Sequence, residues 1–309
     1  MIPLDQPRLR YTAHLQPMLG STFQPTGFPD IGAAKFTRAD GGDSLLVESV
    51  QSMANRLEAT AWDRAAHRPA ALVAALPYVR VHRRDDPEAH LTSSREEAHR
   101  LASAFVRDST LDGTPMLEVI RDRLGLAKDT PLDYPRMARA LVGLDPFCLL
   151  HGVFFSHKTW LGQPRFTRAI SAVVEAHDVR EALSGGRKSD HVRHQIVEGE
   201  GGASEGYGSI PFHRVEWTAG TIKAMFVVDV DLLRSYGLGP GVTELLTLLA
   251  LWEIRTLLAR GLRLRTACDL EVIDQPKDLP EQAELESRIA DLIDSEDVGA
   301  EPITVLWKN

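Results

Sequence analysis

Residues 222–230 read IKAMFVVDV, and residues 242–260 read VTELLTLLALWEIRTLLAR. Every second residue of the first stretch is apolar, which predicts a strand with one buried face. The second stretch is apolar around most of a helical circumference and is followed by Gly261, which indicates a buried helix that ends at a C′ glycine. Because Glu244, Glu253 and Arg255 interrupt it, we expect a core helix and no membrane contact. Alternation resumes over 262–270, so the order is strand, helix, strand.

The sequence before residue 222 predicts further strands and helices. We expect strands at 9–16, 79–82, 147–155 and 166–176, a helix at 44–62 and a mainly helical insertion at about 88–145. A polar stretch at about 184–208 predicts a projecting loop. This order predicts an α+β protein with an RRM-like (ferredoxin-like) antiparallel sheet core and large helical and hairpin insertions. We expect one domain over residues 1–271.

Charge is concentrated at the end of the chain. The formal net charge is −8, and residues 270–309 alone contain eleven acids and three bases. We therefore predict an acidic C-terminal tail at 272–309, in the form of a solvated helix. The preceding residues sum to zero, and a neutral body can carry a basic face for nucleic acid.

The motifs of two common enzyme classes are absent from the sequence. It contains no Walker loop and no HExxH pattern, and we expect no cofactor. Asp190, His191 and His194 form only a weak metal-binding pattern, and His151 is expected to be a core histidine. Two widely spaced cysteines and an N-terminus without an apolar segment favour a cytoplasmic protein.

Several segments together resemble one known family. They are QPTGFPDIGAAK (24–35), VESVQSMANRLEA (47–59), EAHRLAS (97–103), LLHGVFF (149–155) and GLRLRTACDLE (261–271). As a set they resemble the backbone subunit, of the RAMP superfamily, of the type I-G (formerly I-U) CRISPR surveillance complex, or Cascade.

The resemblance implies a non-catalytic subunit that binds guide RNA (crRNA) and polymerises along it. Each copy would contact the next copy head to tail and displace a base with a thumb-like hairpin. Target DNA would be recognised by pairing with the guide, since phosphate contacts position a strand without reading its sequence. Other effector subunits and a recruited helicase-nuclease are the further partners implied.

The same resemblance points to RNA-binding residues. By the family pattern, the helix would grip the RNA backbone through Ser49, Gln51, Asn55 and Arg56, although many relatives carry a lysine–arginine pair where Asn55-Arg56 stands. The preceding loop would contribute Asp30, Gly32 and Lys35. On chemistry alone, Ser49, Ser52 and Arg56 share a helix face that can hydrogen-bond phosphates.

Two other basic groups are candidates. The thumb or an RNA clamp is predicted at Arg187, Lys188, His191, Arg193 and His194. Arg263 and Arg265 share a strand face, where they either bind RNA or pair with acids on a neighbouring strand.

One alternative function is a RAMP-type endoribonuclease that cuts guide or target RNA. Histidines supply acid–base chemistry near neutral pH, so His191 or His194 would be its catalysts, with Asp30 as a further candidate. A small-molecule enzyme is a third hypothesis that no motif supports.

Overall fold

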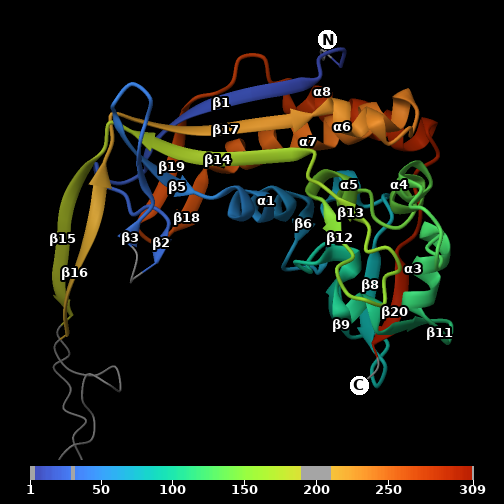
Figure 1. Cartoon of the computed structure of the whole chain (residues 1–309). Helices are drawn as coiled ribbons and strands as arrows, with labels where there is room; N and C mark the ends of the chain where they lie inside the picture. Colours follow the sequence, from blue (N-terminus) through green and yellow to red (C-terminus); the bar gives the residue numbers. More distant parts are fainter. Residues whose placement is uncertain (1–3, 29–31, 189–209, 308–309) are drawn as a thin grey trace, which may run out of the picture.

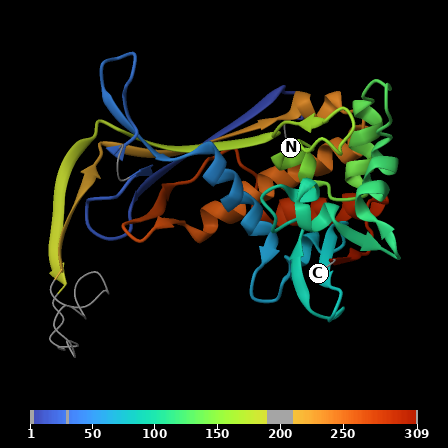
Figure 2. The same cartoon turned by 60° about the horizontal axis from the view of Figure 1, so that its bottom comes forward.

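The computed structural model describes residues 4–28, 32–188 and 210–307 (Figure 1). The chain forms an arch. A large sheet spans the top, a hairpin turns down at one end, and a second sheet with its helices lies at the other end. Figure 2 shows the hairpin at the opposite end of the molecule from the second sheet.

The large sheet has seven strands, and every neighbouring pair is antiparallel. Its order is β18 (Leu262–Arg265), β19 (Cys268–Asp274), β1 (Arg8–Pro17), β17 (Thr221–Asp229), β14 (Ile170–His177), β5 (Asp43–Glu48) and β4 (Lys35–Thr37). The α+β class with an antiparallel sheet is therefore confirmed.

Side-chain alternation builds the centre of this sheet. Tyr11 lies opposite Phe226, and Ala13 lies opposite Ala224, in the β1–β17 pair. All four side chains are buried, whereas the residues between them are more exposed. The predicted strands at 9–16 and 222–230 are thus confirmed.

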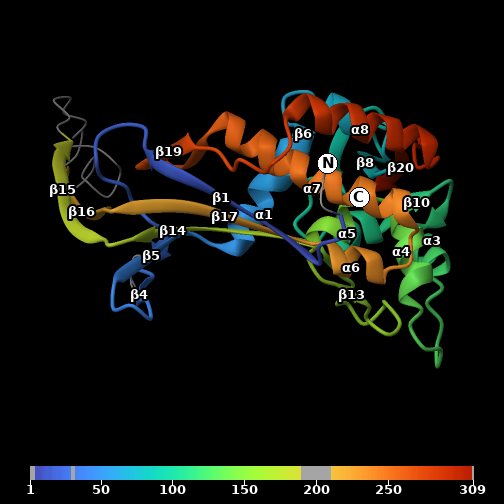
Figure 3. The same ribbon diagram turned by 90° about the horizontal axis from the view of Figure 1, so that it is seen from above.

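Helices cover one face of the sheet. α1 (Val50–Glu58) packs against β14 and against α7 (Pro240–Arg260), which itself contacts β17. α7 is buried along most of its length because it is apolar on all sides, and it ends at Gly261, where φ is 73°. α6 (Val230–Ser235) precedes it, and Figure 3 shows α8 (Gln282–Ser295) alongside it.

A second sheet has the order β11 (Thr114–Pro115), β10 (Ser109–Leu111), β20 (Ile303–Trp307), β8 (Val79–Arg83) and β9 (His90–Ser93). The β20–β8 pair is parallel. The helices of this part are α2 (Ala104–Arg107), α3 (Met116–Leu124), α4 (Tyr134–Val142) and α5 (Phe147–His151). The segment 88–145, expected to be mainly helical, therefore also supplies three short strands.

Two-residue strands and 3-10 turns connect these parts. The strand pairs are β2 (Gly27–Phe28) with β3 (Gly32–Ala33), β6 (Trp62–Asp63) with β7 (Arg68–Pro69), and β12 (Val153–Phe154) with β13 (Arg165–Phe166). The 3-10 turns are η1 (Ala59–Ala61), η2 (Ala71–Val73) and η3 (Arg100–Ala102). The projecting hairpin consists of β15 (Arg180–Lys188) and β16 (Ile210–Thr218).

Several sequence predictions were wrong in detail. The expected helix 44–62 divides into β5, α1 and η1, because residues 43–48 pair with β14 and β4. The expected strand 147–155 begins as α5, and the expected strand 262–270 is the β18–β19 hairpin.

The expectation of a solvated acidic helix at the C-terminus was also wrong. Leu285 and Ile289 of α8 are fully buried, and Val305 of β20 is fully buried in the second sheet. Most acids of α8 lie on its exposed side. The segment 272–309 thus belongs to the packed structure in its described part, and its charge covers only the outer face.

Candidate nucleic-acid interface

α1 begins at a serine cap and presents polar side chains to solvent. The Ser52 amide donates to Ser49 Oγ at 3.2 Å, as expected of an N-cap residue. Gln51 and Asn55 are exposed, and Ser52 is half-buried. No acid stands in the first turn, so the positive end of the helix is not neutralised locally.

Arg56, the predicted phosphate ligand, points back into the protein. Its guanidinium donates to the carbonyls of Arg263 at 3.1 Å and Leu264 at 2.6 Å, and contacts Glu48 Oε2 at 3.3 Å. Arg56 therefore ties α1 to β18, and this geometry leaves it little capacity for RNA.

Arg265 reaches the same carboxylate from β18. It donates to Glu48 Oε2 at 2.8 Å and to the carbonyls of Gln24 and Val47 at 2.7 and 3.0 Å. The Glu48 side chain is only 5% exposed. Of the two roles considered for Arg265, pairing with an acid is therefore the one that the structure shows, whereas Arg263 is exposed. We call Glu48, Arg56 and Arg265 the Glu48 cluster.

The other predicted residues lie away from α1 or outside the described residues. Gly32 is in β3, and Lys35 in β4 forms an ion pair with Asp43 at 3.0 Å near the Trp217 ring. Arg187 and Lys188 end strand β15. Four predicted residues fall outside the described residues: Asp30, His191, Arg193 and His194.

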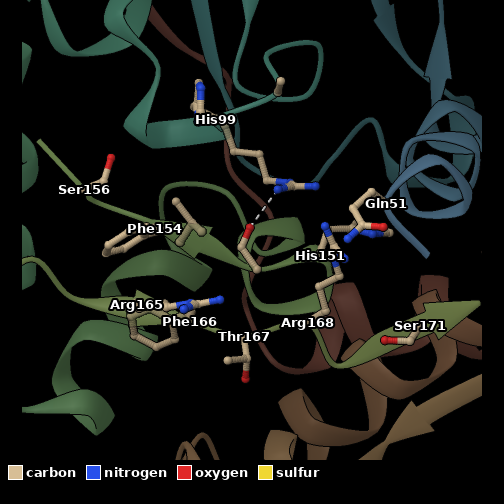
Figure 4. A pocket seen from close by; sticks show the side chains of 14 residues that line it. Gln51, His99, His151, Phe154, Ser156, Arg165, Phe166, Thr167, Arg168 and Ser171 are labelled. Atoms are coloured by element: carbon tan, nitrogen blue, oxygen red, sulfur yellow. Dashed lines mark hydrogen bonds between the residues drawn. The ribbon is translucent and has the colours of Figure 1, made fainter. Parts of the chain in front are cut away.

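A pocket of about 530 Å³ opens beside the first turn of α1 (Figure 4). Gln51 lines it from α1, and the rest of its wall comes from the segments around η3, β12 and β13 and from the start of β14. The lining residues are Gln51, Ala98, His99, Arg100, His151, Gly152, Val153, Phe154, Ser156, Arg165, Phe166, Thr167, Arg168 and Ser171. None of them is an acid.

Two arginines of this pocket lack anionic partners. Within the described residues, neither Arg165 nor Arg168 forms an ion pair or hydrogen bond through its side chain, and Arg165 only lies 5.6 Å from the centre of the Phe154 ring. Burial lowers the pKa of Arg168, repulsion from Arg100 lowers it further, and attraction by Glu58 opposes these two effects only in part. Such a site favours an anion, because an anion would offset both costs.

Arg100 is held differently. Its guanidinium donates to both carboxylate oxygens of Glu58 at 2.6 Å and to the Gly152 carbonyl at 2.9 Å. These contacts hold it rigidly at the pocket wall, where its charge is largely balanced.

A close backbone approach positions β12 and β13. Gly152 has φ of 80°, and a Cβ atom there would lie 2.8 Å from the Phe166 carbonyl oxygen. Only glycine fits both constraints. The β12–β13 pair can therefore pack tightly, with Arg165 and Arg168 on the pocket side (Figure 4).

One of the lining residues, His151, belongs to a buried pair. His151 Nε2 lies 3.0 Å from the Glu253 carboxylate of α7, and both side chains are fully buried. Burial lowers the pKa of His151 to about 4 and raises that of Glu253 well above its usual range. We infer a neutral pair in which Glu253 carries the proton, which confirms His151 as a core histidine.

Sequence reasoning missed Arg165 and Arg168. They stand three residues apart in QPRFTR (163–168), a spacing that carries no signal unless β13 is recognised. The pair is brought to α1 by folding, so only the absence of nearby acids could have drawn attention to it.

A protein-family model described as "CRISPR-associated protein GSU0053 (Cas_GSU0053)" matches residues 9–181, more than half of the chain. The chain belongs to the CRISPR-associated GSU0053 family. The predicted membership of a CRISPR-associated family is thereby confirmed. The part that matches the GSU0053 family includes α1, the Glu48 carboxylate and both pocket arginines.

Other comparisons add little to this assignment. A search of curated proteins found no match. A solved structure described as "CRISPR RNA-guided surveillance complex, pre-nicking" contains a chain 12% identical to this GSU0053-family member, with a TM-score of 0.38 and coverage of 94% of this chain and 88% of that one. At that TM-score the likeness supports no inference. None of the described helices is long and apolar enough to span a membrane.

Proposed function

We propose that this protein is a non-catalytic, guide-RNA-binding backbone subunit of a cytoplasmic CRISPR effector complex. Within the described residues, the pocket beside α1 is the site proposed to bind the RNA. The proposal rests on family membership and on one observation, the acid-free pocket with two unpartnered arginines. RNA phosphates have the charge and the acceptor oxygens that Arg165 and Arg168 need.

An RRM-like core is part of the proposal. The elements β1, α1, β14, β17, α7 and β19 follow one another as β-α-β-β-α-β, and their four strands are neighbours in the large sheet. The β4–β5 hairpin before α1 and the segments between α1 and β14 would then be insertions. This succession supports the proposal because RNA-binding RRM domains share it.

The proposal also includes polymerisation of the protein along the guide RNA. The β15–β16 hairpin projects from one end of the arch, whereas β12 and β13, which line the pocket, lie toward the other end (Figure 1). We expect it to contact the next copy as the thumb, in a head-to-tail arrangement that repeats without closing. Target DNA, other effector subunits and a helicase-nuclease would join this filament.

The pocket can be tested by RNA binding with purified protein. We would measure the affinity for a guide RNA by fluorescence anisotropy at several salt concentrations, using wild type and the double variant Arg165→Gln/Arg168→Gln. We expect about a 10- to 100-fold loss of affinity and a shallower salt dependence, because two phosphate contacts disappear. The control is Arg123→Gln, an exposed arginine at the end of α3.

Equal affinity and equal salt slope in the double variant and the wild type would contradict the assignment of the pocket. The same samples, run on a denaturing gel, test the non-catalytic role. Intact RNA is expected, whereas cleavage by the pure protein would favour the endoribonuclease alternative.

A further inference from the structure

A second cluster of potential ligand atoms lies in the segments that follow α1, and none of its residues lines the RNA pocket. It consists of His67, in the turn between β6 and β7, His90 at the start of β9, and Glu96 just after β9. Their potential ligand atoms all lie within 4.8 Å of one another. His90 Nε2 is 2.9 Å from Glu96 Oε2, and His67 Nδ1 is 3.8 Å from Glu96 Oε1.

The spacing fits a small tetrahedral metal ion. Nitrogen and oxygen ligands lie about 2.0–2.2 Å from Zn²⁺, which puts tetrahedral ligand atoms about 3.3 Å apart. The two measured separations lie on either side of that value, so small side-chain rotations would suffice. Two histidines and one glutamate are also a ligand set found in zinc sites that keep a fourth position open.

The local backbone holds this arrangement in place. His67 has φ of 49°, which is unusual for a residue other than glycine, and this conformation places its ring 4.7 Å from the His90 ring. Asp63 accepts hydrogen bonds from the amides of Ala65 and Ala66 and so fixes the turn. Ser93 Oγ donates to Glu96 Oε2 at 2.9 Å, which orients the carboxylate as outer-sphere partners do at metal sites.

Two further observations point to a ligand here. The two imidazole rings lie close together, with centroids 4.7 Å apart and planes inclined by 34°, so both can present a nitrogen to one ion. In addition, His67 and Glu96 line a separate pocket of about 440 Å³, with Asn55 and Arg64 also in its wall. That space gives access to the cluster and leaves room for a fourth ligand.

We propose that His67, His90 and Glu96 form a binding site for a divalent transition metal, with Zn²⁺ as the best fit and water as the fourth ligand. Imidazole ligands favour zinc and its neighbours in the first transition row over Mg²⁺, which prefers six oxygen ligands. The ion would join the β6–β7 turn to β9 and so fasten the segment after α1 to the second sheet. This inference does not depend on the proposed RNA binding.

The test uses the full chain without RNA. Protein stripped with a chelator is incubated with excess Zn²⁺, desalted and analysed for metal by mass spectrometry. We expect about one Zn²⁺ per chain in wild type and about a tenfold or greater loss of affinity in His67→Asn and in Glu96→Gln. Asparagine is chosen at position 67 because it tolerates a positive φ. The control His157→Asn, at an exposed histidine outside the cluster, should bind zinc as wild type does.

Cobalt supplies a second readout of the same site. Co²⁺ in place of Zn²⁺ should give the strong visible absorption of a four-coordinate ion, absent in His67→Asn. The proposal is overturned if wild type retains no zinc, if His67→Asn and Glu96→Gln retain as much as wild type, or if the Co²⁺ spectrum is that of a six-coordinate ion.

Discussion

The Glu48 cluster and the pocket beside α1 both contain a pair of arginines, but the two pairs serve different purposes. In the Glu48 cluster, Arg56 and Arg265 share one buried carboxylate and donate to four backbone carbonyls. In the pocket, Arg165 and Arg168 have no such partners among the described residues. An arginine whose donors are satisfied within the protein stabilises the fold, whereas one without partners is available to a ligand.

The comparison also shows why sequence position misleads. Arg56 lies in the segment that resembles the RNA-gripping helix, yet its side chain contacts residues more than 200 positions away. Arg168 lies in an unremarkable stretch, yet within the described residues its side chain forms no ion pair or hydrogen bond. Whether a charged side chain can bind a ligand depends on its contacts within the folded protein, and its position in a sequence motif does not reveal these contacts.

The largest expected effect is the loss of the shared carboxylate. Glu48→Ala would leave two partly buried guanidiniums without their acid and should lower the free energy of unfolding by about 3 kcal/mol. Urea denaturation followed by circular dichroism would measure it. If the variant also binds RNA with unchanged affinity at a temperature where it remains folded, the Glu48 cluster has a structural role that is distinct from the role of the pocket. A change in the free energy of unfolding below about 0.5 kcal/mol would contradict that structural role.

The neutral, buried His151–Glu253 pair should contribute two opposed pH dependences to stability. The pKa of His151 is about 4 in the folded chain and about 6.5 when unfolded, so its contribution is complete above pH 6.5 and is lost as the pH falls toward 4. Glu253 stays protonated in the folded chain and ionises when unfolded, so its contribution has the opposite sign over this window and offsets that of His151 in wild type. Glu253→Gln leaves the His151 contribution alone, so its free energy of unfolding should drop by up to about 3 kcal/mol as the pH falls from 6.5 to 4, whereas that of wild type should change less in parallel urea titrations. Identical curves would contradict the assignment.

A smaller effect is expected on RNA affinity, where a pocket arginine and Arg56 should differ. The single variant Arg168→Gln should weaken guide-RNA binding by about tenfold and reduce the salt slope by about one counterion, as expected for one lost phosphate contact. Arg56→Gln, compared at a temperature where it remains folded, should keep the wild-type salt slope. Salt titrations by anisotropy would measure both, and a reduced slope in Arg56→Gln alone would reverse the assignment.

The smallest expected effect concerns stability. Within the described residues, Arg168 forms no ion pair or hydrogen bond that could be lost, and its guanidinium is repelled by Arg100 and attracted by Glu58. Arg168→Gln should therefore leave the free energy of unfolding within about 0.5 kcal/mol of wild type. Thermal and urea unfolding without RNA would show this. A clear loss of stability would mean that Arg168 belongs to the fold, as Arg56 does.

Local patterns were enough to predict β1, β17 and α7, because their burial follows directly from alternation or from an apolar circumference. The same reasoning failed at residues 44–48. Their apolar residues continue the helical spacing of α1, but pairing with β14 and β4 determines their conformation. The pocket could not be predicted, because its residues come together only when α1, η3 and the β12–β13 pair pack against one another.

The strand order of the second sheet has a consequence for how the chain reaches its final state. β20 is the middle strand, and it pairs with β8, which precedes it by more than 200 residues. Such distant pairing raises contact order and slows folding, since a long loop must close before the contact forms. Until residues 303–307 arrive, β8 and β10 present open edges that can pair with other chains. During synthesis on the ribosome, this half of the molecule stays incomplete until residues 303–307 have been made, and we expect it to be the part most prone to aggregation.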